Sequence, residues 1–344
     1  MTKAAGSNGI SGLGPHGEKA TPPERLSLSE SEAAEAHRRR FEIAVVLHTT
    51  SSDWAKQQLA GIVTTLGRYS AAVVEVVDCN FDVARQTREI ERLTRYRPAA
   101  IVSIPIGNAE AADVHRSVSR AGIKLVLIDN VPTGLLPSKD YVSVISADNF
   151  GLGQMAADLL SPHVPRGGVV GIIAYGVDFF VTNERDIAFR KWMAAERSDV
   201  TIKRVRFSTV ENAARATGAL LRANPEMNGL FAVWDDPAMQ AVSVMRERSR
   251  QIPMTTVDLG NDVAIELARG DVIRGIGAQQ PYDQGVAAAK VTIMSLLDRH
   301  TPPWVVLPGL KVTATNVVEA YQVVWHSPAP PELIKSRRNG ERLG

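Results

Sequence analysis

The stretch FEIAVVLHTTSSDWAKQQLAGI (residues 41–62) contains the pattern that decides the fold. It begins with a short β-branched run, continues through a polar turn, and ends in a segment with the apolar spacing of a helix. The same order recurs along the chain, and the runs that we predict as strands are FEIAVVL (41–47), VVEVVD (73–78), AAIVSI (99–104), KLVLID (124–129), YVSVIS (141–146), VVGIIA (169–174), TIKRVRF (201–207), GLFAVW (229–234), MTTVDL (254–259) and VIRGIG (272–277). Alternating strands and helices predict parallel sheets built from right-handed βαβ units, with helices on both faces.

The strands fall into two sets of similar order. A chain of 344 residues is long enough for two domains, so we predict an α/β protein of two Rossmann-like lobes. Residues 1 to about 26 mix Gly, Pro and charge with almost no apolar periodicity, and we expect a disordered arm there. The following SLSESEAAEAHRRR (27–40) predicts a short helix that Ser27 or Ser29 caps.

Composition limits the classes of function. The 39 Lys and Arg nearly balance the 37 Asp and Glu, so the surface lacks the positive field that a nucleic acid partner needs. No run approaches the roughly 20 apolar residues of a membrane span. Residues 1–40 show no apolar segment of an export leader. The single cysteine, Cys79, cannot form an internal disulfide, and we expect it to be a small core residue.

The common catalytic signatures are missing from the sequence. It contains neither GxxxxGK[ST] nor GxSxG, and its seven histidines form no HExxH or HxxxH pair. The glycines of GISGLG (9–14) and GLG (151–153) are interpreted as linker and helix-packing residues rather than a dinucleotide loop. Asp235 and Asp236 are adjacent near a helix start, where capping is the simpler role for one of them. We therefore expect no enzyme, no metal site and no cofactor.

The residues directly after the strands carry the most functional information, because loops at the carboxyl ends of parallel strands converge on ligand crevices. A sugar offers apolar C–H faces and a ring of hydroxyls, so its site needs flat aromatics together with charged or amide groups. The strand-end residues of these types are Trp54, Trp234, Phe207, Asp53, Asp129, Arg185, Asp258 and Gln279. Three alternatives stay open: core packing for the aromatics, turn-making or capping for the aspartates, and a surface ion pair for Arg185.

Several of these segments together resemble the type I periplasmic sugar-binding proteins, the ribose-binding-like solute receptors of ABC transporters. They include IAVVLHTTSSDWAKQQLAGI (43–62), AGIKLVLIDNVPTG (121–134), VSVISADNFGLGQMAADLL (142–160) and IGAQQPYDQG (276–285), within a collinear match over about residues 41–326. The resemblance implies a monosaccharide or polyol held in a cleft between the lobes and delivered to an ABC transporter permease. It also implies a periplasmic location and a monomer.

The same resemblance implies the extent of each lobe. The N-terminal lobe would take 41–147 plus 281–309, the C-terminal lobe 148–280 plus 310–328, and residues 329–344 would form a tail. The chain would cross between the lobes three times, near Ala147, Gln280 and Gly309. Three adjacent crossing strands would then form a hinge on which the lobes close over the ligand.

By position, the resemblance also implies the ligand contacts. Trp54 corresponds to the stacking aromatic of the first loop, and Arg185 to the arginine of the second lobe. The complete set that we expect to contact ligand is Ser52, Asp53, Trp54, Asp129, Asn130, Arg185, Phe207, Trp234, Asp235, Asp258 and Gln279. Asn130 replaces the family's usual arginine, Ala55 a second aromatic, and Trp234 a frequent asparagine, so we expect a pocket shaped differently from a ribose site.

Two other classes of function remain as alternatives. A ligand-sensing regulator, cytoplasmic or extracytoplasmic, would have the same two-lobe core. Residues 1–40 are too short and too rich in Gly and Pro for the helix-turn-helix domain that repressors of the lac type place ahead of that core, so a sensor would act without one. An enzyme on this scaffold is less favoured, since the sequence offers no nucleophile, metal or cofactor loop.

Overall fold

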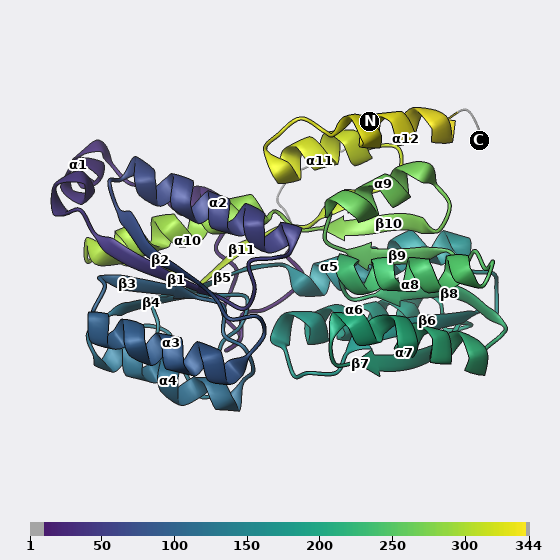
Figure 1. Ribbon diagram of the computed structural model, residues 1–344, viewed down its shortest axis with the longest axis horizontal. Helices are drawn as coiled ribbons and strands as arrows, with labels where there is room; N and C mark the ends of the chain where they lie inside the picture. The colour runs from purple at the N-terminus through teal and green to yellow at the C-terminus, as the bar shows by residue number, and fades with distance from the viewer. Residues whose placement is uncertain (1–9, 342–344) are drawn as a thin grey trace. The chain divides into compact units, whose positions relative to one another are not determined.

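The computed structural model describes residues 10–341, and the predictions for residues 1–9 and 342–344 lie outside these described residues (Figure 1). The chain divides into two compact units: unit 1 comprises Met1–Asp148 and Pro281–Pro308, and unit 2 comprises Asn149–Gln280 and Gly309–Gly344. The chain thus passes from one unit to the other three times. None of the helices within 10–341 combines the length and the apolar character that a membrane crossing requires.

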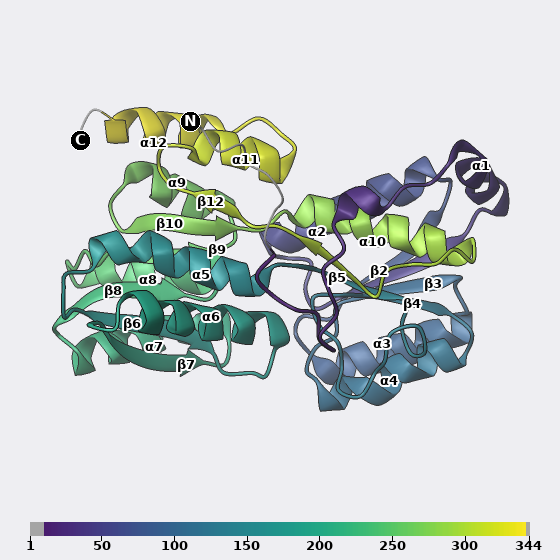
Figure 2. The ribbon, with the colours of Figure 1, turned by 180° about the vertical axis from the view of Figure 1, so that it is seen from behind.

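Unit 1 is built on a six-stranded sheet in the order β11-β5-β4-β3-β1-β2, in which every pairing is parallel. Helices α2 and α10 cover one face of this sheet, and α3 and α4 cover the other (Figures 1 and 2). The bounds are β1 Glu42–Leu47, α2 Asp53–Arg68, β2 Ala72–Asp78, α3 Val83–Tyr96, β3 Ala100–Ser103, α4 Ala109–Arg120, β4 Lys124–Ile128, β5 Ser143–Ala147, α10 Pro281–Leu296 and β11 Trp304–Leu307. A short helix, α1 (Glu30–Arg39), precedes the first strand.

Unit 2 repeats this architecture, with the sheet order β12-β10-β9-β8-β6-β7. Only β12 is antiparallel to its neighbour, β10. Helices α5 and α6 cover one face and α7, α8 and α9 the other (Figures 1 and 2). The bounds are α5 Asn149–Leu160, β6 Val169–Tyr175, α6 Phe180–Glu196, β7 Thr201–Phe207, α7 Val210–Ala223, β8 Met227–Ala232, α8 Asp235–Glu247, β9 Met254–Val257, α9 Asn261–Arg269, β10 Ile273–Ala278, β12 Leu310–Val312, α11 Val317–Trp325 and α12 Pro331–Glu341; two single 3-10 turns are η1 Pro23–Arg25 and η2 Ser161–His163.

The predicted α/β fold with two lobes is confirmed, and each of the ten predicted strands is present. Two further strands, β11 and β12, were not predicted. They are four and three residues long and are flanked by Pro and Gly, so neither gives a strong periodic signal. The predicted short helix is α1, and Ser29 caps it: the Ser29 Oγ accepts from the Glu32 amide, while the Glu32 carboxylate accepts from the Ser29 amide.

Glycines allow the helices on one face of each sheet to approach closely. A Cβ on Gly285 of α10 would lie 2.1 Å from the Gln58 carbonyl oxygen of α2. In unit 2, a Cβ on Gly153 of α5 would lie 2.3 Å from the Arg185 carbonyl oxygen of α6. Both distances are far inside van der Waals contact, so neither position accepts a side chain. The helix-packing role expected for the GLG segment is therefore confirmed at Gly153.

The disordered arm is a wrong prediction for the described residues 10–26. Thr21 extends the sheet of unit 1 beside β11, since its amide donates to Trp304 O and its carbonyl accepts from the Val306 amide, each at 3.1 Å. The amides of Ser11 and Gly12 donate to the Asp148 carboxylate at 2.8 and 3.1 Å. Backbone groups that pair with an edge strand need no apolar periodicity, which explains why composition alone misled here.

Residues 331–341 of the expected tail form helix α12, which was not predicted. Leu333 of this helix is fully buried, and Glu332 lies 3.7 Å from Arg269 of α9. A short amphipathic helix with one buried anchor carries little sequence signal. The expected burial of Cys79, in contrast, is confirmed: its side chain is inaccessible and lies in the hydrophobic core of unit 1.

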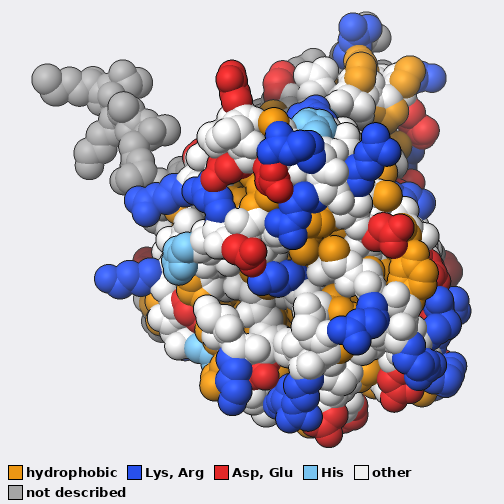
Figure 3. All heavy atoms as spheres, turned by 90° about the vertical axis from the view of Figure 1, so that its left-hand side faces the viewer, with side chains coloured by type: hydrophobic (Ala, Val, Ile, Leu, Met, Phe, Trp, Pro, Cys, Tyr) orange, Lys and Arg blue, Asp and Glu red, His pale blue; other side chains and the backbone are white. Residues whose placement is uncertain are grey.

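Figure 3 shows one face of the molecule, on which basic and acidic side chains lie intermixed.

Candidate functional site

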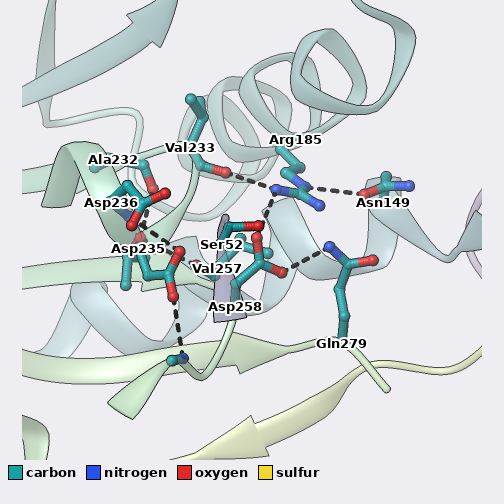
Figure 4. Close-up of polar contacts among 12 residues, drawn as sticks. Ser52, Asn149, Arg185, Ala232, Val233, Asp235, Asp236, Val257, Asp258 and Gln279 are labelled. Atoms are coloured by element: carbon teal, nitrogen blue, oxygen red, sulfur yellow. Dashed lines mark hydrogen bonds and ion pairs between the residues drawn. The ribbon is translucent and has the colours of Figure 1, made fainter. Parts of the chain in front are cut away.

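A network of buried polar side chains lies at the carboxyl edge of the unit 2 sheet, with Arg185 at its centre (Figure 4). The Arg185 Nε donates to Asn149 Oδ1, and its Nη1 donates to Val233 O, both at 2.9 Å. The same Nη1 lies 3.4 Å from Asp258 Oδ2. Asp258 Oδ1 in turn accepts from Gln279 Nε2 at 2.6 Å. Arg185 and Asp258 are each almost inaccessible, so the surface ion pair left open for Arg185 is excluded.

The local fold explains how these side chains meet. Arg185 lies in α6, which Gly153 admits close to α5, and Asn149 is the first residue of α5. Asp258 and Gln279 directly follow β9 and β10, two neighbouring parallel strands, so their side chains emerge at the same edge. Asp258 has a φ of 73°, a left-handed conformation that is uncommon for a residue with a Cβ. This backbone conformation is a local cost that the surrounding hydrogen bonds offset.

Asp235 adds a second carboxyl to this network. Its Oδ2 accepts from the Gly260 amide at 3.0 Å, and its Oδ1 accepts from the Asp236 amide at 3.0 Å. Burial, followed by the neighbouring negative charges of Asp258 and Asp236, holds the pKa of Asp235 well above its ordinary value. Burial also raises the pKa of Asp258, although Arg185 and Gln279 act in the opposite direction. The two carboxyls of Asp235 and Asp258 thus lie close enough for their charges to interact, and burial favours retention of a proton at Asp235.

Three aromatic rings form a cluster in the same unit, at the carboxyl ends of β6, β7 and β8. The Trp234 ring centroid lies 5.2 Å from that of Tyr175 in an edge-on arrangement and 5.1 Å from that of Phe207. Tyr175 and Phe207 are 5.4 Å apart. Phe207 is buried, whereas Tyr175 and Trp234 are half-buried, so two of the three rings keep accessible surface for an apolar ligand face.

Unit 1 carries its own aromatic cluster at the ends of β1 and β2. The His48 ring lies 4.8 Å from Phe81 and 5.8 Å from Trp54, with both neighbours presented edge-on. Trp54 occupies the first turn of α2, whose N-terminus Ser52 caps by accepting from the Ala55 amide at 3.2 Å. Asp53 lies 3.7 Å from Lys56. Trp54 is half-buried, as expected for a residue on a polar loop.

Asp129 and Asn130 follow β4 of unit 1, and both are buried. Asp129 has a φ of 60°, and its amide donates to Ile145 O. The Asn130 side-chain amide donates to Pro105 O at 3.2 Å and to Gly107 O at 3.0 Å. This amide therefore fixes the loop after β3, in addition to any contact that its oxygen makes with a ligand.

Comparison with known proteins gives the family. Residues 43–298 match the model of a family described as the periplasmic binding protein domain. This chain belongs to that family. Members are defined as binding proteins, which agrees with the expectation that the chain is not an enzyme. A D-ribose/D-allose-binding protein of Pseudomonas aeruginosa is 26% identical over 224 residues, which are 64% of this chain and 70% of that protein.

Solved structures of similar fold are also solute-binding proteins. One from Mycobacterium smegmatis with bound glycerol has a TM-score of 0.74 at 21% identity, over 82% of this chain and 96% of that one. One from Agrobacterium radiobacter in complex with D-arabinose has a TM-score of 0.75 at 19% identity, over 85% and 99%. One from Agrobacterium vitis with α-D-tagatopyranose has a TM-score of 0.76 at 18% identity, over 84% and 100%. These likenesses confirm the periplasmic binding protein fold.

The expected ligand contacts of this periplasmic binding protein separate into two groups. The structure brings Arg185, Asp258, Gln279 and Asp235 into one network, with Phe207 and Trp234 in the neighbouring aromatic cluster. The remaining five belong to unit 1, where Asp129 and Asn130 follow β4, and Ser52, Asp53 and Trp54 lie at the start of α2. The expected cleft between the lobes, the hinge and the ligand-contacting role of each residue remain predictions.

Sequence reasoning missed four residues of these clusters. Asn149 and Tyr175 belong to the site of unit 2, and His48 and Phe81 to the aromatic cluster of unit 1. His48 directly follows β1 and Asn149 starts α5, whereas Tyr175 ends β6 and Phe81 lies in the turn between β2 and α3. A rule that takes every polar or aromatic residue at or just beyond a strand end would have found all four. The capping role expected for one of Asp235 and Asp236 is wrong at α8, whose N-cap is Trp234 without a side-chain cap hydrogen bond. The Asp235 side chain instead accepts from the Gly260 amide ahead of α9. Over residues 10–341, no three His, Cys, Asp or Glu side chains are grouped as ligands for a metal ion.

Proposed function

We propose that this periplasmic binding protein binds a monosaccharide or polyol and delivers it to an ABC importer. The observation that carries the proposal is the Arg185, Asp258 and Gln279 network, which stands beside a cluster of aromatic rings at the carboxyl edge of a parallel sheet. In open α/β sheets, ligands bind at this edge.

The chemistry of the network matches vicinal hydroxyls. A guanidinium donates in a fixed planar geometry, a carboxylate accepts, and a carboxamide does both, so together they fix the positions of several hydroxyl groups. Half-buried rings such as Trp234 supply the flat surface on which the C–H face of a sugar packs. The bound or named ligands of the relatives are of this class, including ribose, allose, arabinose, tagatose and glycerol.

The contacting residues that we propose are the eleven expected ones, together with Asn149 and Tyr175. The partner that we propose is the permease of an ABC importer, the location is the periplasm, and the solution state is a monomer. The name and description of the family support the location, and the transporter assignments of the structural relatives support the partner.

A ligand screen tests this function directly. The melting temperature of the chain is measured with D-ribose, D-allose, D-arabinose, D-tagatose, allitol and glycerol. A sugar present at 100 times its dissociation constant stabilises the folded state by about 2.7 kcal/mol, so we expect at least one compound to raise the melting temperature by several degrees. If none of the six does so, the proposal is wrong.

Two substitutions then locate the site. Asp258→Asn removes a charged acceptor, and we expect the affinity for the sugar found in the screen to fall at least tenfold. Trp54→Ala removes an aromatic face and should reduce the same affinity by a comparable factor while the circular dichroism spectrum stays unchanged. Asp113→Asn, at a carboxyl that is 99% exposed, serves as the control. Unchanged affinity in the Trp54 variant would assign Trp54 to packing alone.

A further inference from the structure

The loop that presents Asp258 is held by a helix outside the matched family region. The loop at 258–261, defined as the three residues between β9 and α9 together with the first residue of α9, is contacted by two side chains of helix α11 (Val317–Trp325). The Trp325 Nε1 donates to Leu259 O at 2.9 Å. The Tyr321 hydroxyl donates to Asn261 Oδ1 at 2.6 Å. The family match ends at residue 298, so these contacts lie beyond it.

The two side chains act as one rigid element. Tyr321 and Trp325 are one helical turn apart, and their rings stack at 5.0 Å between centroids with an interplanar angle of 7°. Tyr321 is buried and Trp325 half-buried. A stacked pair loses little further freedom when it donates hydrogen bonds, so both donors are held ready for the loop.

The contacted backbone is the part whose position decides where the carboxyls of the network lie. Asp258 holds a left-handed φ of 73°, a conformation that relaxes unless its neighbours fix it. On one side of it, the Asp258 amide donates to Gly277 O. On the other side, the Gly260 amide donates to Asp235 Oδ2. The contacts from α11 lie at residues 259 and 261, on either side of Gly260. They therefore hold the backbone that follows Asp258 and the amide that donates to Asp235.

Helix α11 is itself anchored next to the other partner of Asp258. The strand β12 leads into α11 and pairs antiparallel with β10, with Leu310 opposite Ala278. Gln279, which donates to Asp258 Oδ1, directly follows Ala278. The turn between β12 and α11 is closed by Asn316, whose side chain accepts from the Thr313 amide and donates to Lys311 O. One continuous segment therefore supports Asp258 from the side of β10 and from the side of the loop.

We propose that Tyr321 and Trp325 are positioning residues of the ligand site: they hold the loop at 258–261 so that Asp258 and Asp235 stay aligned with Arg185. The part of this proposal that concerns ligand affinity rests on the proposed function. The part that concerns the loop and its carboxyls does not.

The experiment compares Trp325→Phe and Tyr321→Phe with Val323→Ala. The first two variants each remove one hydrogen-bond donor and keep an aromatic ring, while Val323 is a half-exposed residue of the same helix and serves as the control. Nuclear magnetic resonance measures two quantities in the chain without ligand: amide exchange at Gly260, and the titration of the Asp258 and Asp235 side-chain carboxyl carbons.

We expect exchange at the Gly260 amide to rise about tenfold in the Phe variants, while exchange at residues 254–257 of β9 stays unchanged. We also expect the titration of Asp235 to move, because its hydrogen bond from Gly260 weakens, and Val323→Ala to behave as the parent chain. Equal acceleration over all of unit 2 would show a merely structural role and overturn the proposal. An unchanged Gly260 amide and unchanged titrations would also overturn it.

A measurement of affinity separates this proposal from the proposed function. D-ribose is titrated into the parent chain and the Phe variants by calorimetry, and if it binds, we expect its affinity to fall about tenfold in the variants with little change in melting temperature. A parent chain that binds none of the six sugars of the screen would defeat the proposed function, whereas the exchange and titration results would still decide the role of Tyr321 and Trp325.

Discussion

The sixth residue of the helix that follows the first strand is Gln58 in unit 1 and Arg185 in unit 2. Both side chains are buried, and both helices pack on the first helix after a passage between the units. Gln58 donates to Gln284 Oε1 at 3.2 Å, which makes a neutral amide pair. Arg185 instead donates to Asn149 and lies beside Asp258. The two units thus place a neutral pair and a charged network at the same position of one architecture, which shows that the fold fixes the position and the side chain fixes the chemistry.

The resemblance between the units extends to the strand ends. Asp129 follows β4 and Asp258 follows β9, which occupy the same place in the two sheet orders. Both aspartates have a left-handed φ, 60° and 73° respectively. The crossing helices α10 and α5 each carry glycine as their fifth residue, Gly285 and Gly153. The two units thus have similar backbone conformations at these positions but different side chains. Exchanging those side chains tests the comparison directly.

The largest expected effect comes from making unit 2 resemble unit 1 at this position. Arg185→Gln removes the cation beside the buried Asp258, and we expect the free energy of unfolding to fall by about 3 kcal/mol or more. Gln58→Leu in unit 1 removes one neutral hydrogen bond and should cost about 1 kcal/mol. Urea denaturation at neutral pH measures both. Equal costs would show that the charge in unit 2 adds nothing to stability.

The next effect is on how stability depends on pH. We expect one buried group in unit 1 to reduce stability as the pH falls, and one in unit 2 to reduce it as the pH rises. Complete burial lowers the pKa of His115, in unit 1, to about 4 from 6.5. The unfolded chain therefore takes up the proton first as the pH falls, and stability is lost between about pH 6.5 and pH 4, by at most about 3 kcal/mol. Melting temperatures across this range should fall less steeply in His115→Gln than in the parent chain.

In unit 2, the pKa of Asp235 is raised, so the unfolded chain loses the proton first as the pH rises. Its contribution to stability is complete below about pH 3.8 and is lost as the pH rises through the folded pKa. Asp235→Asn mimics the protonated state and should gain stability relative to the parent chain as the pH rises over the same scan. If both variants changed with pH in the same direction, the contrast between the units would not hold.

The last contrast concerns the two glycines. Gly153→Ala and Gly285→Ala each place a methyl group about 2 Å from a carbonyl oxygen of the facing helix, and we expect each to cost about 2 kcal/mol through displacement of that helix. Gly153→Ala should also weaken sugar binding, because the displaced helix carries Arg185. Gly67→Ala, where a Cβ meets no atom within 4 Å, is the control. If the Gly285 variant lost sugar binding to the same extent, the effect of Gly153→Ala could not be assigned to displacement of the helix that carries Arg185.

Much of the fold could be predicted because parallel strands buried on both faces give strong, short apolar runs. Eight of the ten predicted strands are mostly buried and follow this rule, and the edge strands β2 and β7 are partly exposed. The strands β11 and β12, which have four and three residues next to Pro and Gly, were not predicted. The order of residues 10–26 could not be predicted, since Thr21 joins the sheet through backbone groups that are the same in every sequence. The helix at 331–341 was missed for a related reason: its one buried anchor, Leu333, gives no period.

The residues of the candidate site that lie at strand ends could be predicted from the sequence. Arg185, Asp258 and Gln279 were expected from position, and their mutual hydrogen bonds are found in the structure. Asn149 was missed because it begins a helix and shows no special pattern of its own. The contacts of Tyr321 and Trp325 with the loop at 258–261 join residues about 60 positions apart, and no local pattern in the sequence points to such a pairing.

The order of the ten predicted strands, the near balance of charge and the residue types at the strand ends follow from the sequence, because they depend on local periodicity and composition. The packing of remote segments against one another set which carboxyls have a raised pKa, which two carbonyls Asn130 binds and which helix contacts the loop after β9. Such pairings depend on distances between segments remote along the chain, and a hydrogen bond forms or fails over a few tenths of an ångström.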